Sequence, residues 1–135
     1  MVGIKIFEIN TIPTDLAHLV TRFAEIFASM TWGDPAQELD LDRVNTSDDN
    51  YFASFSTKVV SEDPRVPLII DMYLTIFFEV NYKKEKVLIK AKNEFAFSGK
   101  SEWLLNMIRG LLNRIITKDI KLKIIEAVEK ALEFS

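Results

Sequence analysis

Residues 68–82, LIIDMYLTIFFEVNY, alternate without interruption between large apolar side chains and a more polar set. The apolar set takes every second position: Leu68, Ile70, Met72, Leu74, Ile76, Phe78, Val80 and Tyr82. Successive side chains of a strand point to opposite faces of a sheet. The stretch therefore predicts one long strand with a fully apolar face.

The residues that follow predict an antiparallel partner for this strand. Residues 83–86, KKEK, have the composition of a turn, and a second alternating run comes after them. Its apolar positions are Val87, Ile89, Ala91, Phe95 and Phe97. Two such runs joined by a short turn indicate a β-hairpin. The other face of the hairpin includes Ile69, Tyr73 and Phe77, so we expect part of that face to be covered.

Shorter elements precede the hairpin. Residues 2–9 alternate loosely and predict a strand. Residues 15–30 place apolar side chains at helical spacing behind an N-cap at Thr14, which predicts a helix in the crossover to the next strand. Residues 37–60 predict either one strand bent near residues 47–49 or two short strands.

Two helices are predicted after the hairpin. Residues 102–116 are apolar over about half of the helix circumference, so we expect one side to pack on the sheet and the other on a second subunit. The last helix should bury Leu122, Ile125, Val128 and Leu132. The 135 residues fit one domain. We therefore expect a single α+β domain over residues 1–135 with a four-stranded antiparallel sheet. The sequence does not determine the order of its strands.

Composition and charge narrow the function classes. The chain has no cysteine, which excludes disulfides, thiolate metal sites and cysteine nucleophiles. The net charge of −3 divides into −7 over residues 1–63 and +4 over residues 64–135, and neither half is basic enough to predict a nucleic acid partner. The sequence shows no signal peptide and no long apolar run, so we expect a cytoplasmic protein with no membrane partner.

The sequence predicts no catalytic residue, cofactor or metal, and so no enzyme. His18, the only histidine, lies on the polar side of the predicted helix, and the glycines stand alone instead of in a phosphate-binding motif. The aspartates of residues 40–49 suggest a calcium loop. However, Asn45 and Tyr51 occupy the positions that require glycine and a bidentate glutamate.

Large aromatic residues are more numerous than one sheet face can bury. They are Phe23, Phe27, Trp32, Phe52, Tyr73, Phe77 and Trp103. One interpretation is a well-filled core with an oligomer interface. The other is an exposed apolar groove that binds extended or unfolded chains.

The order of elements and one short motif resemble SecB, the export chaperone, and the SecB-like proteins. Trp32 and Pro35 precede Leu-Asp-Leu-Asp at residues 39–42, and Asp48-Asp49 leads to the long hairpin and the C-terminal helices. The resemblance implies an antiparallel sheet with a helix lying on it, a chaperone function, and assembly into homodimers or homotetramers.

Two features depart from that family. The crossover contains a clear helix where the family is usually irregular. In addition, the hairpin region that is acidic in SecB and docks the SecA motor contains Lys83, Lys84, Lys86, Lys90 and Lys92 here. This charge reversal argues against SecA as a partner and favours a relative with another partner, such as the chaperones that escort antitoxins, or with no motor.

The function that we expect is an ATP-independent holdase that binds unfolded polypeptide. The predicted client anchors are apolar and line a groove at the crossover helix and the last helix: Phe23, Phe27, Trp32 and Trp103. The alternatives are a carrier of small apolar ligands, in which a curved sheet grips a helix, and a structural oligomer without a ligand.

Overall fold

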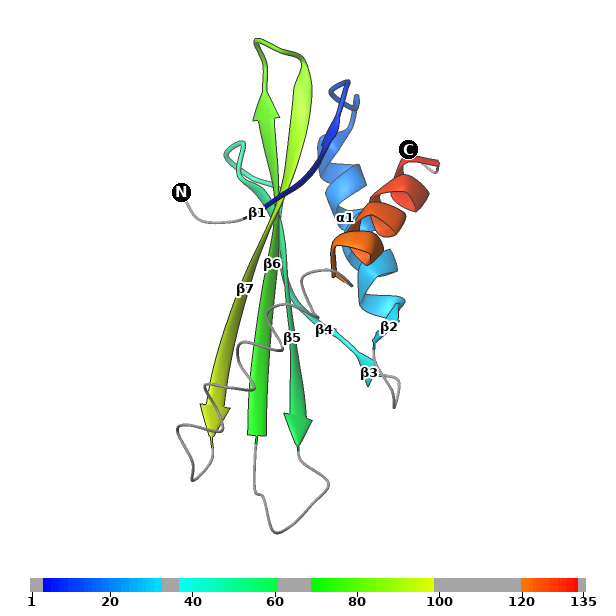
Figure 1. Ribbon diagram of the computed structural model, residues 1–135. Helices are drawn as coiled ribbons and strands as arrows, with labels where there is room; N and C mark the ends of the chain where they lie inside the picture. The colour runs from blue at the N-terminus through cyan, green and yellow to red at the C-terminus, as the bar shows by residue number, and fades with distance from the viewer. Residues whose placement is uncertain (1–3, 33–36, 61–68, 99–119, 134–135) are drawn as a thin grey trace.

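The computed structural model describes residues 4–32, 37–60, 69–98 and 120–133. These residues form an α+β structure in which two helices lie on one face of an antiparallel sheet (Figure 1). The elements in chain order are β1 (Ile4–Ile9), α1 (Leu16–Ser29), β2 (Thr31–Trp32), β3 (Gln37–Glu38), β4 (Asp40–Asn45), β5 (Tyr51–Val60), β6 (Ile69–Asn81), β7 (Lys86–Ser98) and the C-terminal helix 120–133. The sheet order is β1-β7-β6-β5-β4, while β2 and β3 pair separately.

The β6–β7 hairpin has the predicted form. Asn81 pairs with Lys86, and the register runs without a break to Ile69 and Ser98. The turn is fixed by Glu85 at φ 55° and by the Lys84 backbone N–H, which donates to Asn81 Oδ1 at 3.1 Å. On the inner face of β6 the side chains of Met72, Leu74, Ile76 and Phe78 are buried, which confirms the predicted apolar face at these positions. Tyr82 lies in the turn and is 64% exposed.

The sheet has five strands, so the prediction of four is wrong. The difference arises at residues 46–50, where the chain turns sharply instead of bending. The Asn50 backbone N–H donates to Ser47 O at 3.0 Å, and both intervening residues, Asp48 and Asp49, have φ near +55°. Two consecutive left-handed residues form the tight turn that matches the twist of a hairpin. Residues 40–45 therefore fold back on β5 as a separate edge strand.

Helix α1 carries the chain from the β1 edge of the sheet to the β4 edge. Its N-cap is Asp15, one residue after the predicted Thr14, because the Asp15 carboxylate accepts from the His18 backbone N–H at 3.0 Å. The buried face of α1 lies against β4 and β5. That face consists of Leu16, Leu19, Val20, Phe23, Ala24 and Phe27.

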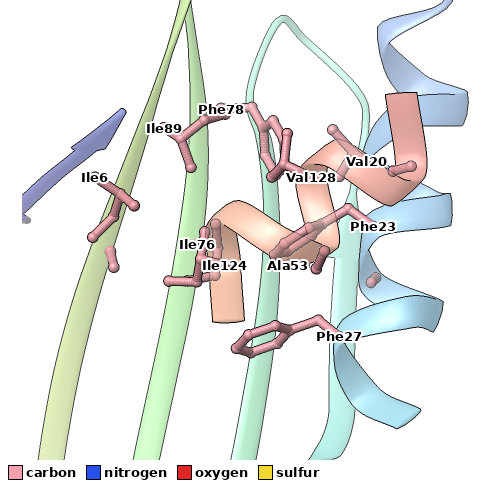
Figure 2. Close-up of a cluster of buried hydrophobic side chains, with 14 of the residues drawn as sticks. Ile6, Val20, Phe23, Phe27, Ala53, Ile76, Phe78, Ile89, Ile124 and Val128 are labelled. Carbon is pink, nitrogen blue, oxygen red and sulfur yellow. The ribbon is translucent and has the colours of Figure 1, made fainter. Parts of the chain in front are cut away.

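The C-terminal helix completes the core, as Figure 2 shows. Its buried residues are Ile120, Ile124, Ala127, Val128 and Ala131. The predicted burial of Leu122 is wrong, since that side chain is 61% exposed. At 100° per residue Leu122 lies about 200° around the helix from Ile120, so both cannot face the sheet. The predicted helix 102–116 lies outside the described residues.

No helix in the described ranges combines the length and the apolar character that crossing a membrane would need.

Candidate functional site

The structure places two of the four predicted client anchors in the core. Phe23 and Phe27 are 0% exposed, with ring centroids 5.4 Å apart. Phe23 packs edge-on against Phe78 at 5.3 Å, and Phe27 packs edge-on against Phe55 at 4.9 Å. The expectation that these two residues line an exposed groove is therefore wrong. The helix has one apolar face, and burying that face against the sheet stabilises the protein more than leaving it in water.

The side chains of the other two predicted anchors lie outside the described part of the structure. Trp32 belongs to the short strand β2 and pairs with Gln37, but its side chain is outside the described part of the molecule. Trp103 lies outside the described residues altogether.

The opposite face of the sheet, which we name the open face, is covered neither by α1 nor by helix 120–133. It carries three aromatic side chains, Phe52, Tyr73 and Phe77, which we name the open-face patch. Phe52 and Phe77 are paired across β5 and β6 with ring centroids 6.0 Å apart. Tyr73, four residues away from Phe77 along β6 and paired with Ser56, is 46% exposed.

Charged and hydroxyl side chains surround the open-face patch. The Arg43 guanidinium lies 5.4 Å from the centre of the Phe52 ring, within the range of a cation–π contact. Lys90 pairs with Phe77 from the β7 side, while Ser54 and Ser56 lie beside them on β5. The surface can therefore offer aromatic faces to a bound chain and hydrogen-bonding groups around them.

The sequence supplied a signal for this surface, because Phe52, Tyr73 and Phe77 belong to the aromatic surplus described above. What the sequence alone does not contain is the register that joins Phe52 to Phe77. That pairing depends on the turn at residues 46–50 and on the β5–β6 ladder.

A second feature of the open face is a pocket of about 490 Å³ beside the β6–β7 turn, which we name the hairpin pocket. Leu88 lies in it between Glu8 of β1 and Glu79 of β6, its neighbours across the two ladders. The full lining is Glu8, Glu79, Val80, Asn81, Tyr82, Lys83, Lys84, Lys86, Leu88 and Lys90.

Both glutamates of the hairpin pocket are paired with lysines. Glu8 Oε1 is 3.0 Å from Lys5 Nζ and Glu8 Oε2 is 3.7 Å from Lys86 Nζ, while Glu79 pairs with Lys90. The hydrogen bond and charge of Lys5, with a smaller contribution from Lys86, lower the pKa of Glu8 below its ordinary value. Each glutamate charge is therefore balanced by a neighbouring lysine, and the ionised form of Glu8 is favoured.

One hydrogen bond joins the two turns at this end of the sheet. Tyr82 Oη donates to Asp49 Oδ1 at 3.2 Å, so the turn of residues 46–50 is tied to the β6–β7 turn. The bond and the charge of Asp49 favour the protonated phenol and raise the pKa of Tyr82.

We expect Tyr82 to ionise above the ordinary value of 10.0. Because the folded-state pKa is raised, the stabilisation from this bond is fully present below the pKa of the unfolded chain and is lost as the pH rises through the folded-state pKa. The tyrosinate absorbance of the native protein minus that of Tyr82→Phe gives this titration directly. Asp49→Asn should move the midpoint down toward the ordinary value, and an unmoved midpoint would contradict the assignment.

The described residues contain no group of three or more histidine, cysteine, aspartate or glutamate side chains placed to hold a metal ion. What the open face presents is aromatic surface and lysine charge, both of which are suited to binding a chain.

Comparison with known proteins gave no match among family models, curated proteins or solved structures. The resemblance to SecB is therefore a hypothesis that depends on the residues quoted for it.

Proposed function

We propose that this chain is an ATP-independent holdase and that the open-face patch is its surface for unfolded polypeptide. The observation that carries the proposal is the position of Phe52, Tyr73 and Phe77 on a sheet face that the described helices leave uncovered. Tyr73 is exposed, and Phe52 and Phe77 are half-buried. Accessible aromatic side chains beside an arginine are the composition that supplies most of the energy at protein-binding surfaces.

The size of the open-face patch favours weak, exchangeable binding over a permanent interface. The area that three aromatic residues can bury is far smaller than the roughly 800 Å² that each partner buries in a stable complex. Covering about 100 Å² of aromatic surface contributes about 2.5 kcal/mol before the cost of ordering the client. A holdase benefits from this weakness because its clients must be released.

Membership of the SecB-like family is part of the proposal. The described α+β fold with its single large antiparallel sheet is compatible with it. Assembly into homodimers or homotetramers also remains a proposal. Sedimentation at micromolar concentration tests it, and a monomer would contradict it.

The alternatives have less support from the described residues. A carrier needs an enclosed apolar cavity, whereas the hairpin pocket is lined largely by lysines and glutamates. A structural oligomer would leave the open-face patch without a client, and the experiment below distinguishes that outcome.

The holdase proposal predicts that Phe52→Ser with Tyr73→Ser weakens suppression of aggregation. The assay uses a chemically unfolded test protein without nucleotide. Each aromatic anchor should be worth about 1 kcal/mol, so about thirty times more of the double variant should be needed for equal suppression. The melting temperature should change little, because neither side chain belongs to the buried core.

Tyr82→Ser is the matched control, since Tyr82 is an exposed aromatic residue that lies outside the open-face patch. It should suppress aggregation like the native protein. Full suppression by the double variant, or an equal loss in the control, would contradict the assignment of the client surface to the open-face patch.

A further inference from the structure

We propose that the hairpin pocket binds an acidic peptide segment of a partner protein, with Lys83 and Lys84 as its anchors. The two anchors are separate from the client surface because they lie in the β6–β7 turn. The pocket and the open-face patch adjoin at Lys90, which lines the pocket and pairs with Phe77.

The charge of the hairpin pocket is not balanced internally. Its two carboxylates are already paired, Glu8 with Lys5 and Lys86, and Glu79 with Lys90. Lys83 and Lys84, by contrast, form no ion pair with any residue that the structure describes. Glu85, the remaining charge of the turn, is exposed and does not line the pocket. The turn therefore presents two lysines whose charge is available to a partner.

The backbone presents these lysines in a defined position. Lys84 N–H is bonded to Asn81 Oδ1, and Glu85 takes the left-handed conformation that closes the turn. The bond from Tyr82 to Asp49 ties this turn to the neighbouring one. A partner consequently meets lysines that extend from an ordered turn, which reduces the entropic cost of binding.

The lining also contains an apolar contact surface. Leu88 is half-buried between Glu8 and Glu79, whereas Val80 is on the opposite face of β6 and packs against the core. The volume of about 490 Å³ is in the range of pockets that enclose a small ligand or a few side chains. An extended peptide can place an apolar side chain on Leu88 while its carboxylates reach Lys83 and Lys84.

A peptide fits these features better than a nucleic acid or a polyphosphate. Single-stranded nucleic acid binds on aromatic stacking surfaces in a continuous basic groove. Tyr82 is the aromatic residue in the lining of the hairpin pocket, so the pocket lacks the series of rings on which successive bases stack. A peptide needs no such series of rings, because it can place carboxylates at Lys83 and Lys84 and an apolar side chain on Leu88.

The test measures binding of two fluorescein-labelled decapeptides by fluorescence anisotropy. The acidic peptide has six glutamates around a central Leu-Phe pair, and the control peptide has lysine at each glutamate position. The native protein should bind the acidic peptide only, and binding should weaken as salt rises, since exposed charges are screened. Lys83→Glu with Lys84→Glu should raise the Kd by about tenfold or more, because two attractions become repulsions.

The control is Lys121→Glu with Lys130→Glu, which changes the net charge equally at two exposed residues of the C-terminal helix, the second of them paired with Glu126. It should raise the Kd by less than about threefold, since only the overall field changes. Equal losses in the two double variants, no binding of the acidic peptide, or tighter binding of a single-stranded oligonucleotide of equal charge would overturn the proposal.

Aggregation suppression is measured on the same variants. Lys83→Glu with Lys84→Glu should retain it, because these lysines lie outside the open-face patch. Failure of the acidic-peptide proposal is thereby distinguishable from failure of the holdase proposal.

Discussion

Replacing Phe23 with alanine should lower the free energy of unfolding by about 3 to 5 kcal/mol, the usual cost of removing a large aromatic side chain from a packed core. The ring is fully buried and contacts Phe27 on the same helix and Phe78 on β6. Its removal leaves a cavity between α1 and the sheet. Chemical unfolding followed by circular dichroism measures the loss, provided that two probes report the same transition.

Tyr73→Ala is the control for this measurement, because Tyr73 is an aromatic residue on the open face and is 46% exposed. It should cost less than about 1 kcal/mol. An equally small loss for Phe23→Ala would show that α1 leaves the sheet and exposes the ring, as a client groove at this position requires.

Replacing Ile76 with alanine should cost about 2 to 5 kcal/mol, and Ile76→Val about 0.5 to 1.5 kcal/mol. Ile76 has no exposed surface, and its neighbours across the two ladders are Ala53 and Ala91. Because both neighbours are small, the Ile76 side chain fills much of the space beneath the C-terminal helix, where it lies beside Ile124 (Figure 2). The same unfolding experiment applies.

Thr75→Ala is the control for this measurement, since Thr75 directly precedes Ile76 in β6 and points to the other face of the sheet. Thr75 points to the open face, so its replacement should cost less than about 1 kcal/mol. If Thr75→Ala were the more damaging change, the assignment of the buried face of β6 would be wrong.

Strand β6 was the most predictable element, because large apolar residues at every second position identify which of its two faces is buried. Met72, Leu74, Ile76 and Phe78 are all buried as predicted. The hairpin followed for the same reason, since the polar residues 83–86 separate two alternating runs.

The number of strands was harder to predict because it depends on one turn. Asp48 and Asp49 both adopt positive φ, a conformation that the sequence signals most clearly when glycine or asparagine is present. A pair of aspartates is a weaker signal, so one bent strand and two strands were equally compatible with residues 37–60.

An amphipathic pattern locates the apolar face of a helix but does not identify what that face packs against. The apolar face of α1 was correctly located, but the pattern does not say whether the sheet or a client covers it. In the structure the sheet covers it, and Phe23 and Phe27 became core residues. In the C-terminal helix, the predicted apolar face included Leu122. The face that is buried in the structure includes Ile120 and Ile124 instead.

The hairpin pocket could not be predicted, because its lining comes from separate elements. The lysines of the turn were visible in the sequence, but Glu8 reaches them only because β1 pairs with β7. Long-range strand pairing is the information that a local pattern does not contain.

The place of β1 in the sheet also affects how the protein is made. Ile9 pairs with Val87, about 80 residues later in the chain, so β1 has no strand to join until β7 exists. At ribosomal rates of 5–20 residues per second, β1 emerges roughly 4 to 16 s before its partner. During synthesis the nascent chain therefore carries an unpaired apolar strand, which makes β1 a segment at risk of wrong pairing in the cell.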